Sequence, residues 1–324
     1  MINRLSHVEI AVTDLQRSRE FYCDVLGFVA FAKSADALWL RAPDEFDVWS
    51  LKLTRDEEPG LLAFGFRVDG DARLDELAAL HGRLGLPWGW RAAGEEPGRG
   101  RMLRVGTPGG HVVDFEHDVD EVATRDERGP HLPMRHTHAR RGVGLGRLDH
   151  VNVRTANLAP ALAYWQEELQ FAASERQIDD RGEVQRAWLR RAPFSHDMAI
   201  GRDDRIGFHH VAYTLRDTHA LIAAADVLAD AGRPVIEYGP GRHGITDACF
   251  LYIRDPDGNR IELYAGDYVR DLDRPPVDWT LEQYQTIGLL WWGHQPPASF
   301  LEAGPVLDRS LITTTRDLEE VAAS

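Results

Sequence analysis

The residues of this sequence most able to do chemistry are a glutamate and two histidines in apolar, strand-like segments. Glu262 stands between Ile261 and Leu263 in "DPDGNRIELY", where a carboxylate would be buried and must be paired, protonated or bound to a metal. His150 in "RLDHVNV" and His210 in "GFHHVAY" lie in comparable segments. Two neutral imidazoles and one carboxylate leave open positions on a bound ion, which is typical of non-haem Fe(II) and also suits Mn(II). The sequence therefore predicts a metal site.

An internal repeat explains how these three residues could meet. Residues 4–28 align with 147–171, and residues 106–118 align with 254–267. Two further strand–helix starts lie between these segments, so the chain contains four similar units of a strand, a helix and following strands. We expect the units to pair into two similar α+β domains, with matching strands brought to one place in each.

The two halves differ at the candidate ligand positions. The C-terminal half has His, His and Glu, whereas the matching N-terminal residues are His7, Ala63 and Asp114. Only the C-terminal half offers a full ligand set, so one metal site is expected there. His7 is expected to have a structural role.

The repeat also predicts the domain boundaries. An N-terminal domain that binds no metal spans 1–120, and the catalytic domain spans 147–270. A linker rich in Pro and Gly spans 121–146, and its histidines are interpreted as solvated rather than metal-binding: His131, His136 and His138. The aromatic tail 271–324 is expected to cover the site or an oligomer interface.

Composition excludes several classes of partner. The net charge of −15 argues against nucleic acid and anionic membranes. No segment approaches the roughly 18 consecutive apolar residues of a membrane-spanning helix, and the N-terminus shows no signal-peptide pattern. Cys23 and Cys249 are interpreted as small buried hydrophobes in a reducing compartment. We expect a cytoplasmic protein.

At this point the motifs resemble a known family. "RLDHVNV", "AWLRRAPFSHD", "GFHHVAY", "GPGRHG" and "YIRDPDGNRIELY" resemble type I extradiol ring-cleavage dioxygenases of the vicinal oxygen chelate superfamily, most closely the homoprotocatechuate 2,3-dioxygenase branch. The resemblance implies paired βαβββ modules and a homo-oligomer, often a tetramer. It also implies cleavage of an aromatic diol by O2 through bidentate chelation to Fe(II), giving a muconic semialdehyde-type product.

The resemblance implies roles for five further residues. His196 matches the family's acid/base histidine, and His243 matches a histidine just outside the metal ligands. Tyr252 matches a tyrosine that hydrogen-bonds a substrate oxygen. Asn152 and Trp188 match residues that line the pocket for substrate and oxygen. His209, next to His210, should alternate to the opposite strand face and make a structural hydrogen bond.

The sequence departs from the family where the substrate carboxylate is held. Tyr238 stands where that branch has an arginine, so it would line the substituent pocket without a charge. The stretch before "WWG" in the tail likewise offers Gly288, Leu289 and Leu290 where that branch has a further pair of arginines. Arginine is the natural bidentate partner of a carboxylate. A neutral or apolar catechol is therefore expected over homoprotocatechuate, unless Arg242 or Arg254 compensates.

Other functions remain open at this level. Homoprotocatechuate itself, or a hydroquinone or aminophenol ring, could be cleaved with the same ligands. A glyoxalase or epimerase would normally use ligands from both halves or both subunits. A ligand-sequestering protein of the same fold would not need an acid/base histidine.

Overall fold

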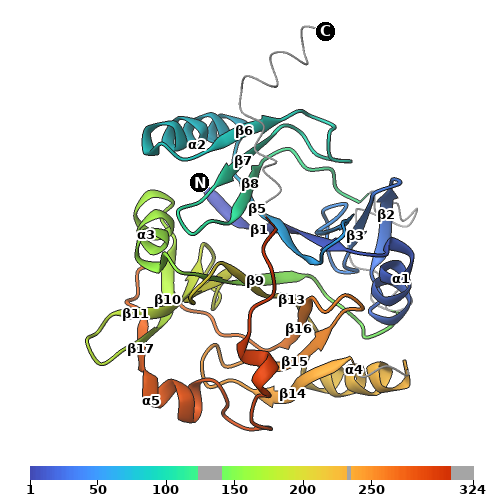
Figure 1. Cartoon of the computed structure of the whole chain (residues 1–324), viewed down its shortest axis with the longest axis vertical. Helices are drawn as coiled ribbons and strands as arrows, with labels where there is room; N and C mark the ends of the chain where they lie inside the picture. Colours follow the sequence, from blue (N-terminus) through green and yellow to red (C-terminus); the bar gives the residue numbers. More distant parts are fainter. Residues whose placement is uncertain (123–140, 232–234, 308–324) are drawn as a thin grey trace, which may run out of the picture.

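The computed structural model describes residues 1–122, 141–231 and 235–307 (Figure 1). Most of the predicted linker lies outside these ranges, together with the end of the predicted tail and with His131, His136 and His138. Among the described residues, no helix combines the length and apolarity needed to cross a membrane.

Residues 2–116 supply an eight-stranded sheet of order β2-β3-β4-β1-β5-β8-β7-β6. Its strands are β1 (Ile2–Val12), β2 (Val29–Lys33), β3 (Ala37–Arg41), β4 (Leu51–Arg55), β5 (Gly60–Val68), β6 (Trp88–Arg91), β7 (Met102–Gly106) and β8 (Val112–Glu116).

The rest of the described chain forms a nine-stranded sheet of order β14-β15-β16-β13-β9-β12-β11-β10-β17. Its strands are β9 (Leu148–Thr155), β10 (Ala172–Ile178), β11 (Val184–Arg190), β12 (Met198–Arg202), β13 (Gly207–Thr214), β14 (Ile236–Arg242), β15 (Cys249–Arg254), β16 (Arg260–Ala265) and β17 (Val277–Thr280).

Five α-helices accompany the sheets in the described chain. They are α1 (Leu15–Arg19), α2 (Asp71–Leu84), α3 (Leu158–Ala163), α4 (Thr218–Asp230) and α5 (Leu281–Gln283). Helices α1, α3 and α5 each continue into a π-helical turn, at Glu20–Val25, Tyr164–Glu168 and Tyr284–Gly288, and a 3₁₀ turn spans Ala298–Leu301.

The two sheets repeat one arrangement of strands, which confirms the α+β fold of four βαβββ modules. A central antiparallel pair, β1 with β5 or β9 with β13, lies between parallel partners in each sheet. When the second order is read from its other end and β17 is left out, it is the first order with eight added to every strand number. Equivalent sequence positions therefore lie at equivalent points of the two sheets.

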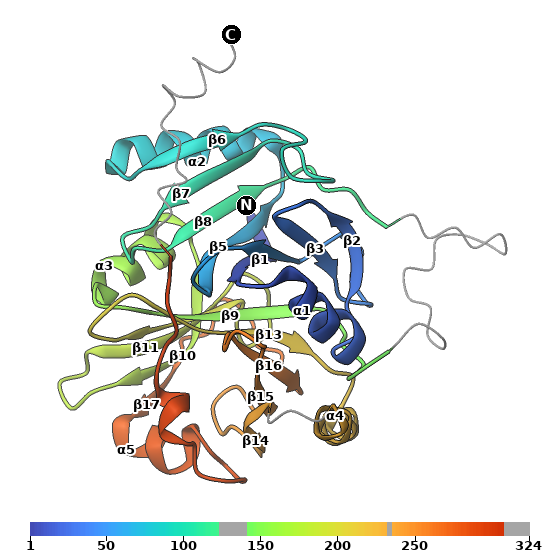
Figure 2. The ribbon, with the colours of Figure 1, turned by 45° about the vertical axis from the view of Figure 1, so that its right-hand side comes forward.

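The modules share one hydrophobic core across the boundary between the sheets. Trp165, in the turn after α3, stacks on Phe64 of β5 with ring centroids 6.3 Å apart, and Phe171 packs edge-on against Phe66. On the other side, the hydroxyl of Tyr22 donates to Asp255 at 2.9 Å. Each sheet is thus covered partly by a helix from the other half, and Figure 2 shows α3 beside the first sheet. Burying each large side chain contributes roughly 1.5–3 kcal/mol, so the two sheets stabilise each other.

The tail returns along the second sheet. Strand β17 pairs in parallel with the edge strand β10, and Thr280 caps α5 by accepting a hydrogen bond from the backbone of Gln283. After the 3₁₀ turn, Gly304 pairs with Phe208 of β13 and Leu307 reaches the first sheet. Several side chains of residues 281–301 therefore lie next to strands β9, β11 and β13 of the second sheet, and the red end of the described chain runs along this sheet in Figure 1.

Candidate metal centre and substrate cavity

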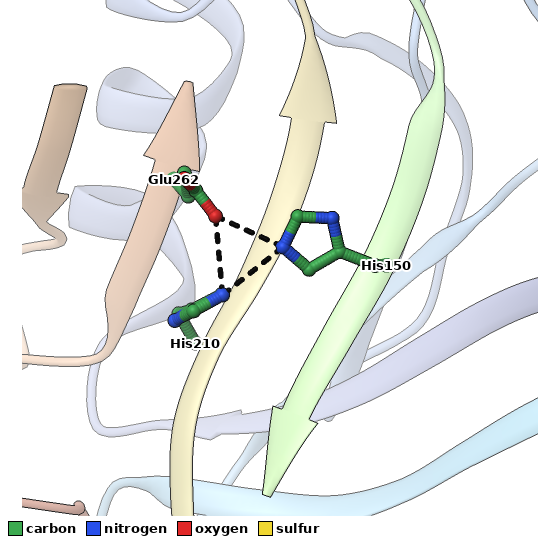
Figure 3. Close-up of side chains that lie close together, drawn as sticks. All are labelled: His150, His210 and Glu262. Carbon is green, nitrogen blue, oxygen red and sulfur yellow. Dashed lines mark hydrogen bonds and ion pairs between the residues drawn. The ribbon is translucent and has the colours of Figure 1, made fainter. Parts of the chain in front are cut away.

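Strand pairing brings the three predicted ligands to one point. In the register of the second sheet, His210 of β13 lies opposite Asn152 of β9, and Ala212 lies beside both His150 and Glu262. The two Nε2 atoms are 3.1 Å apart, and Oε2 of Glu262 lies 2.9 Å from that of His150 and 3.1 Å from that of His210 (Figure 3). All three side chains are buried.

Hydrogen bonds behind the two histidines set which nitrogen is free. Nδ1 of His150 donates to Asp149 at 2.9 Å, which leaves Nε2 as a lone-pair donor. Nε2 of His209 lies 2.8 Å from the carbonyl of Phe300 and must donate to it, so its Nδ1 accepts from Nδ1 of His210 at 2.7 Å. When both rings are neutral, as metal binding requires, each Nε2 therefore carries its lone pair on the side of Glu262. Such outer partners are typical of metal-binding histidines.

The electrostatics of the three groups call for a cation between them. Burial opposes ionisation of Glu262, but its contacts with the imidazoles of His150 and His210 outweigh burial and hold its pKa well below the usual range. Burial lowers the pKa of His210 to about 4, whereas Asp149 and Glu262 overcome burial and raise the pKa of His150 to about 9. The donor atoms all lie within 4.8 Å of one another, and a divalent ion with one carboxylate and two imidazole ligands fits this set.

The bond pattern at His209 corrects one expectation. Its side chain was expected on the opposite strand face, but the register between β13 and β9 shifts between Phe208 and His210. This bulge breaks the alternation and places the His209 ring 4.9 Å from that of His210, on the side of the cavity. The expected structural hydrogen bond is present, to Phe300.

A cavity of about 290 Å³ opens from the three ligands, and most of the predicted pocket residues line it. They are Asn152, Trp188, His196, His243 and Tyr252. Its outer side is formed by the tail, through Leu281, Tyr284, Gln285, Leu289, Phe300 and Leu301. The size suits a substituted aromatic ring, near the lower limit of ligand pockets.

His196 and the pair of His243 and Tyr252 reach the centre from different directions. The ring of His196 lies 4.0 Å from that of His150, and burial followed by the charge of His150 lowers its pKa well below the usual value. Nδ1 of His243 donates to the carbonyl of Leu289, so its Nε2 accepts the hydroxyl proton of Tyr252 at 3.0 Å. The orientation of the tyrosine hydroxyl is thereby set by the tail.

Tyr238 takes a different place from the one expected. Its ring stacks behind Tyr252 at 5.9 Å and packs on Phe300 at 4.6 Å, and it is not among the residues that line the cavity. Its hydroxyl is buried with no hydrogen-bond partner among the described residues. Tyr238 therefore supports from behind the aromatic wall of the cavity, which Tyr252 and Phe300 form.

The candidate compensating arginines also lie elsewhere. Arg242 pairs with Asp247 at 2.6 Å, and Arg254 pairs with Glu237 at the same distance; neither lines the cavity. Two arginines that the sequence analysis did not single out do line it, Arg154 and Arg186. Arg154 could have been found, because it alternates with His150 and Asn152 along one strand.

Comparisons with known proteins agree with this geometry. The model of the Glyoxalase/Bleomycin resistance protein/Dioxygenase superfamily matches residues 4–125 and 147–263. The chain belongs to this superfamily. It is 30% identical to a metapyrocatechase of Geobacillus stearothermophilus, and the match covers 96% of each chain. It is 28% identical to a manganese-dependent 2,3-dihydroxybiphenyl 1,2-dioxygenase of Geobacillus genomosp. 3, and that match covers 90% of this chain and 94% of the relative. The crystal structure of homoprotocatechuate 2,3-dioxygenase from Arthrobacter globiformis matches with a TM-score of 0.86 and 34% identity, covering 95% of this chain and 94% of the other.

Within this dioxygenase-superfamily fold, an arginine pairs with the equivalent carboxylate of the first sheet. His7 and Asp114 lie 3.3 Å apart, as the repeat predicts, but Arg104 forms a two-pronged pair with Asp114 at 2.7 Å. Arg104 faces Asp114 in the strand register, in the same place where Tyr252 faces Glu262. A guanidinium of the chain thus neutralises the buried carboxylate of the first sheet.

The first prediction concerns metal content. His150→Gln should lower the bound metal far below one ion per chain, because losing a ligand weakens binding by more than the roughly 10–100-fold that loss of an outer partner costs. The matched change at the equivalent position, His7→Gln, should leave the metal content of the protein unchanged. Elemental analysis after gel filtration measures both; metal loss from the His7 variant alone would refute the assignment.

The second prediction concerns the pH dependence of stability. Burial opposes protonation of His7, but Glu116 and Asp114 outweigh it and raise its pKa to about 9. Protonated His7 therefore stabilises the fold below about pH 6.5, and this contribution disappears as the pH rises to 9. The free energy of unfolding lost in His7→Gln should be about 3 kcal/mol larger at pH 6 than at pH 9.5. Urea unfolding at both pH values tests this, and a pH-independent difference would contradict it.

Proposed function

We propose that this protein is a metal-dependent extradiol dioxygenase that cleaves a catechol-type ring with O2. The observation that carries the proposal is the convergence of three buried ligands in a cavity that also presents His196, His243 and Tyr252. Related proteins that span nearly the whole chain have names of ring-cleaving dioxygenases, which supports the same chemistry. The expected product is a muconic semialdehyde-type acid.

Fe(II) is the proposed metal, with Mn(II) as the alternative. The ligand set accepts either ion, and one relative is named manganese-dependent. When bound, the ion would hold both ring oxygens of the diol, favour loss of a phenolic proton and leave a position for oxygen.

The protein residues then orient the ring and handle protons. His196 lies beside His150 in the cavity, where a neutral imidazole can accept a proton from the diol and return it later. Tyr252, held by His243, offers a polar contact to a ring oxygen. Asn152 and Trp188 would bound the ring on the β9 and β11 side.

The aromatic wall of the cavity supports contact with uncharged parts of the substrate. Tyr252, Phe300 and Leu289 present rings and an aliphatic side chain there, with Tyr238 behind them. A carboxylate at this wall would lose its water without gaining a cationic partner. The carboxylate of homoprotocatechuate should therefore not bind at this aromatic wall, although the resemblance to the homoprotocatechuate branch would place it there.

A homo-oligomer, as the family suggests, and a cytoplasmic location are part of the proposal. Trp291 and Trp292 of the tail are 60% and 46% exposed, and large exposed indoles are frequent in protein interfaces. Light scattering would test whether a tetramer forms; a monomer would remove this part of the proposal.

The third prediction tests the reaction itself. Protein loaded anaerobically with Fe(II) should consume one O2 per ring with catechol, 4-alkylcatechols or 2,3-dihydroxybiphenyl, and should form a yellow semialdehyde. Homoprotocatechuate and hydroquinone belong in the same oxygen-electrode panel, since they distinguish the alternative ring substrates. No uptake from any member, despite bound iron, would refute the proposed function.

The fourth prediction tests the role of His196. His196→Phe should keep its metal content, because this ring is not one of the three ligands, while kcat falls by about 10²–10⁴-fold, as expected for loss of an acid/base group. Oxygen uptake and elemental analysis on the same sample separate the two effects. Loss of the metal would instead make His196 part of the coordination shell.

A further inference from the structure

Two arginines share one row on the inner face of the second sheet. Arg154 of β9 pairs in register with Gly201 of β12, which in turn pairs with Arg186 of β11. Residues opposite each other in a sheet point to the same face, so both guanidinium groups face the cavity that they line.

Gly201 makes this arrangement possible. A Cβ atom at that position would lie 2.9 Å from Nη1 of Arg154 and 3.1 Å from Cγ of Arg186. The missing side chain leaves room for two long cationic side chains over one strand. The row lies two residues beyond that of Asn152 and Trp188, or about 7 Å farther from the metal ligands along the strands.

Neither guanidinium is neutralised by the protein. Within the described residues, Arg154 and Arg186 form no ion pair, although Arg154 is only 7% exposed. Nη1 of Arg154 donates to the side chain of Asn152 and to a backbone carbonyl, and its Nε and Nη2 donate to no described atom. Arg186 donates to Gln177 at 3.1 Å and lies over the ring of Tyr284.

The cost of this arrangement appears in the titration of Arg154. Burial and then the neighbouring charge of Arg186 lower its pKa to about 9. A buried cation without a counterion is expensive. The buried Arg190 donates to three backbone carbonyls instead, and two further buried arginines have acidic partners. Arg104 pairs with Asp114, and Arg260 pairs with Glu237.

We propose that Arg154 and Arg186 form an anion subsite for a carboxylate carried by a ring substituent of the substrate. The inference rests on the proposed function, because the metal centre places the diol and the arginine row receives the far end of the substituent. Planar guanidinium groups match the geometry of a carboxylate, and a carboxylate bound by both would offset the repulsion between the two positive charges. The substrate class is therefore an acid-bearing catechol whose side chain points to β9 and β11.

This proposal revises the expectation of a neutral substituent. That expectation rested on the absence of arginines at position 238 and before the tail "WWG", and on Arg242 and Arg254, which do not line the cavity. The two walls now have separate roles: the aromatic wall contacts uncharged parts of the substrate, and the arginine row selects charge. A purely structural alternative is that Arg154 serves only to orient Asn152.

The fifth prediction uses anaerobic binding, which does not depend on turnover. Calorimetry with Fe(II)-loaded protein compares 3-(2,3-dihydroxyphenyl)propionate and 3-(3,4-dihydroxyphenyl)propionate with their methyl esters. At least one acid should bind about 10-fold or more tightly than its ester, the effect expected for charge-assisted hydrogen bonds. Arg186→Gln and Arg154→Lys should lower this acid-to-ester ratio about 10-fold, in the lysine variant because the two-pronged geometry is lost.

The matched control is Arg202→Gln on β12, which removes the same charge from an exposed side chain that hydrogen-bonds Gln185. It should leave the ratio unchanged. Equal binding of acids and esters by the wild type would overturn the subsite, as would equal losses for acid and ester in both cavity variants. Acid preference without oxygen uptake from any catechol would keep the subsite and refute the proposed reaction.

Discussion

The structure of the second sheet depends on one buried charge, that of Glu262. Its carboxylate lies among apolar strands and faces two imidazole nitrogens whose other ring atoms are engaged by Asp149 and His209. Those outer hydrogen bonds leave lone pairs where a proton would otherwise be, so the three groups are arranged for a divalent cation rather than for one another. The bulge at His209 is part of the same arrangement, because it lets two consecutive histidines act on one side of the strand.

In the first sheet, a residue of the chain neutralises the equivalent buried carboxylate. Asp114 occupies the position of Glu262, but Arg104 binds it with both prongs and His7 adds a further contact. Both sheets thus bury a carboxylate at the same register position and neutralise it differently. A resident guanidinium stabilises the fold, whereas an ion with open coordination positions can also bind substrate.

The cavity acquires its character from elements far apart in the sequence. The tail supplies Leu289 and Phe300, whose carbonyls receive the bonds that orient His243 and His209. The strands of the third module supply the opposite, basic wall. A ring held at the metal would therefore meet an aromatic surface on one side and two guanidinium groups on the other.

The sequence by itself determined the repeat, the α+β modules and the three ligands, because strand alternation and matched repeat positions are visible in residue order. It also placed Asn152, Trp188, His196, His243 and Tyr252 around one cavity through the family resemblance. Only the tertiary structure decided that Tyr238 lies behind that cavity and that His209 faces it. Cross-strand neighbours, bulges and the path of the tail depend on register between distant segments. The row of Arg154, Gly201 and Arg186 exists for the same reason, since three strands must align before two separate arginines face one space.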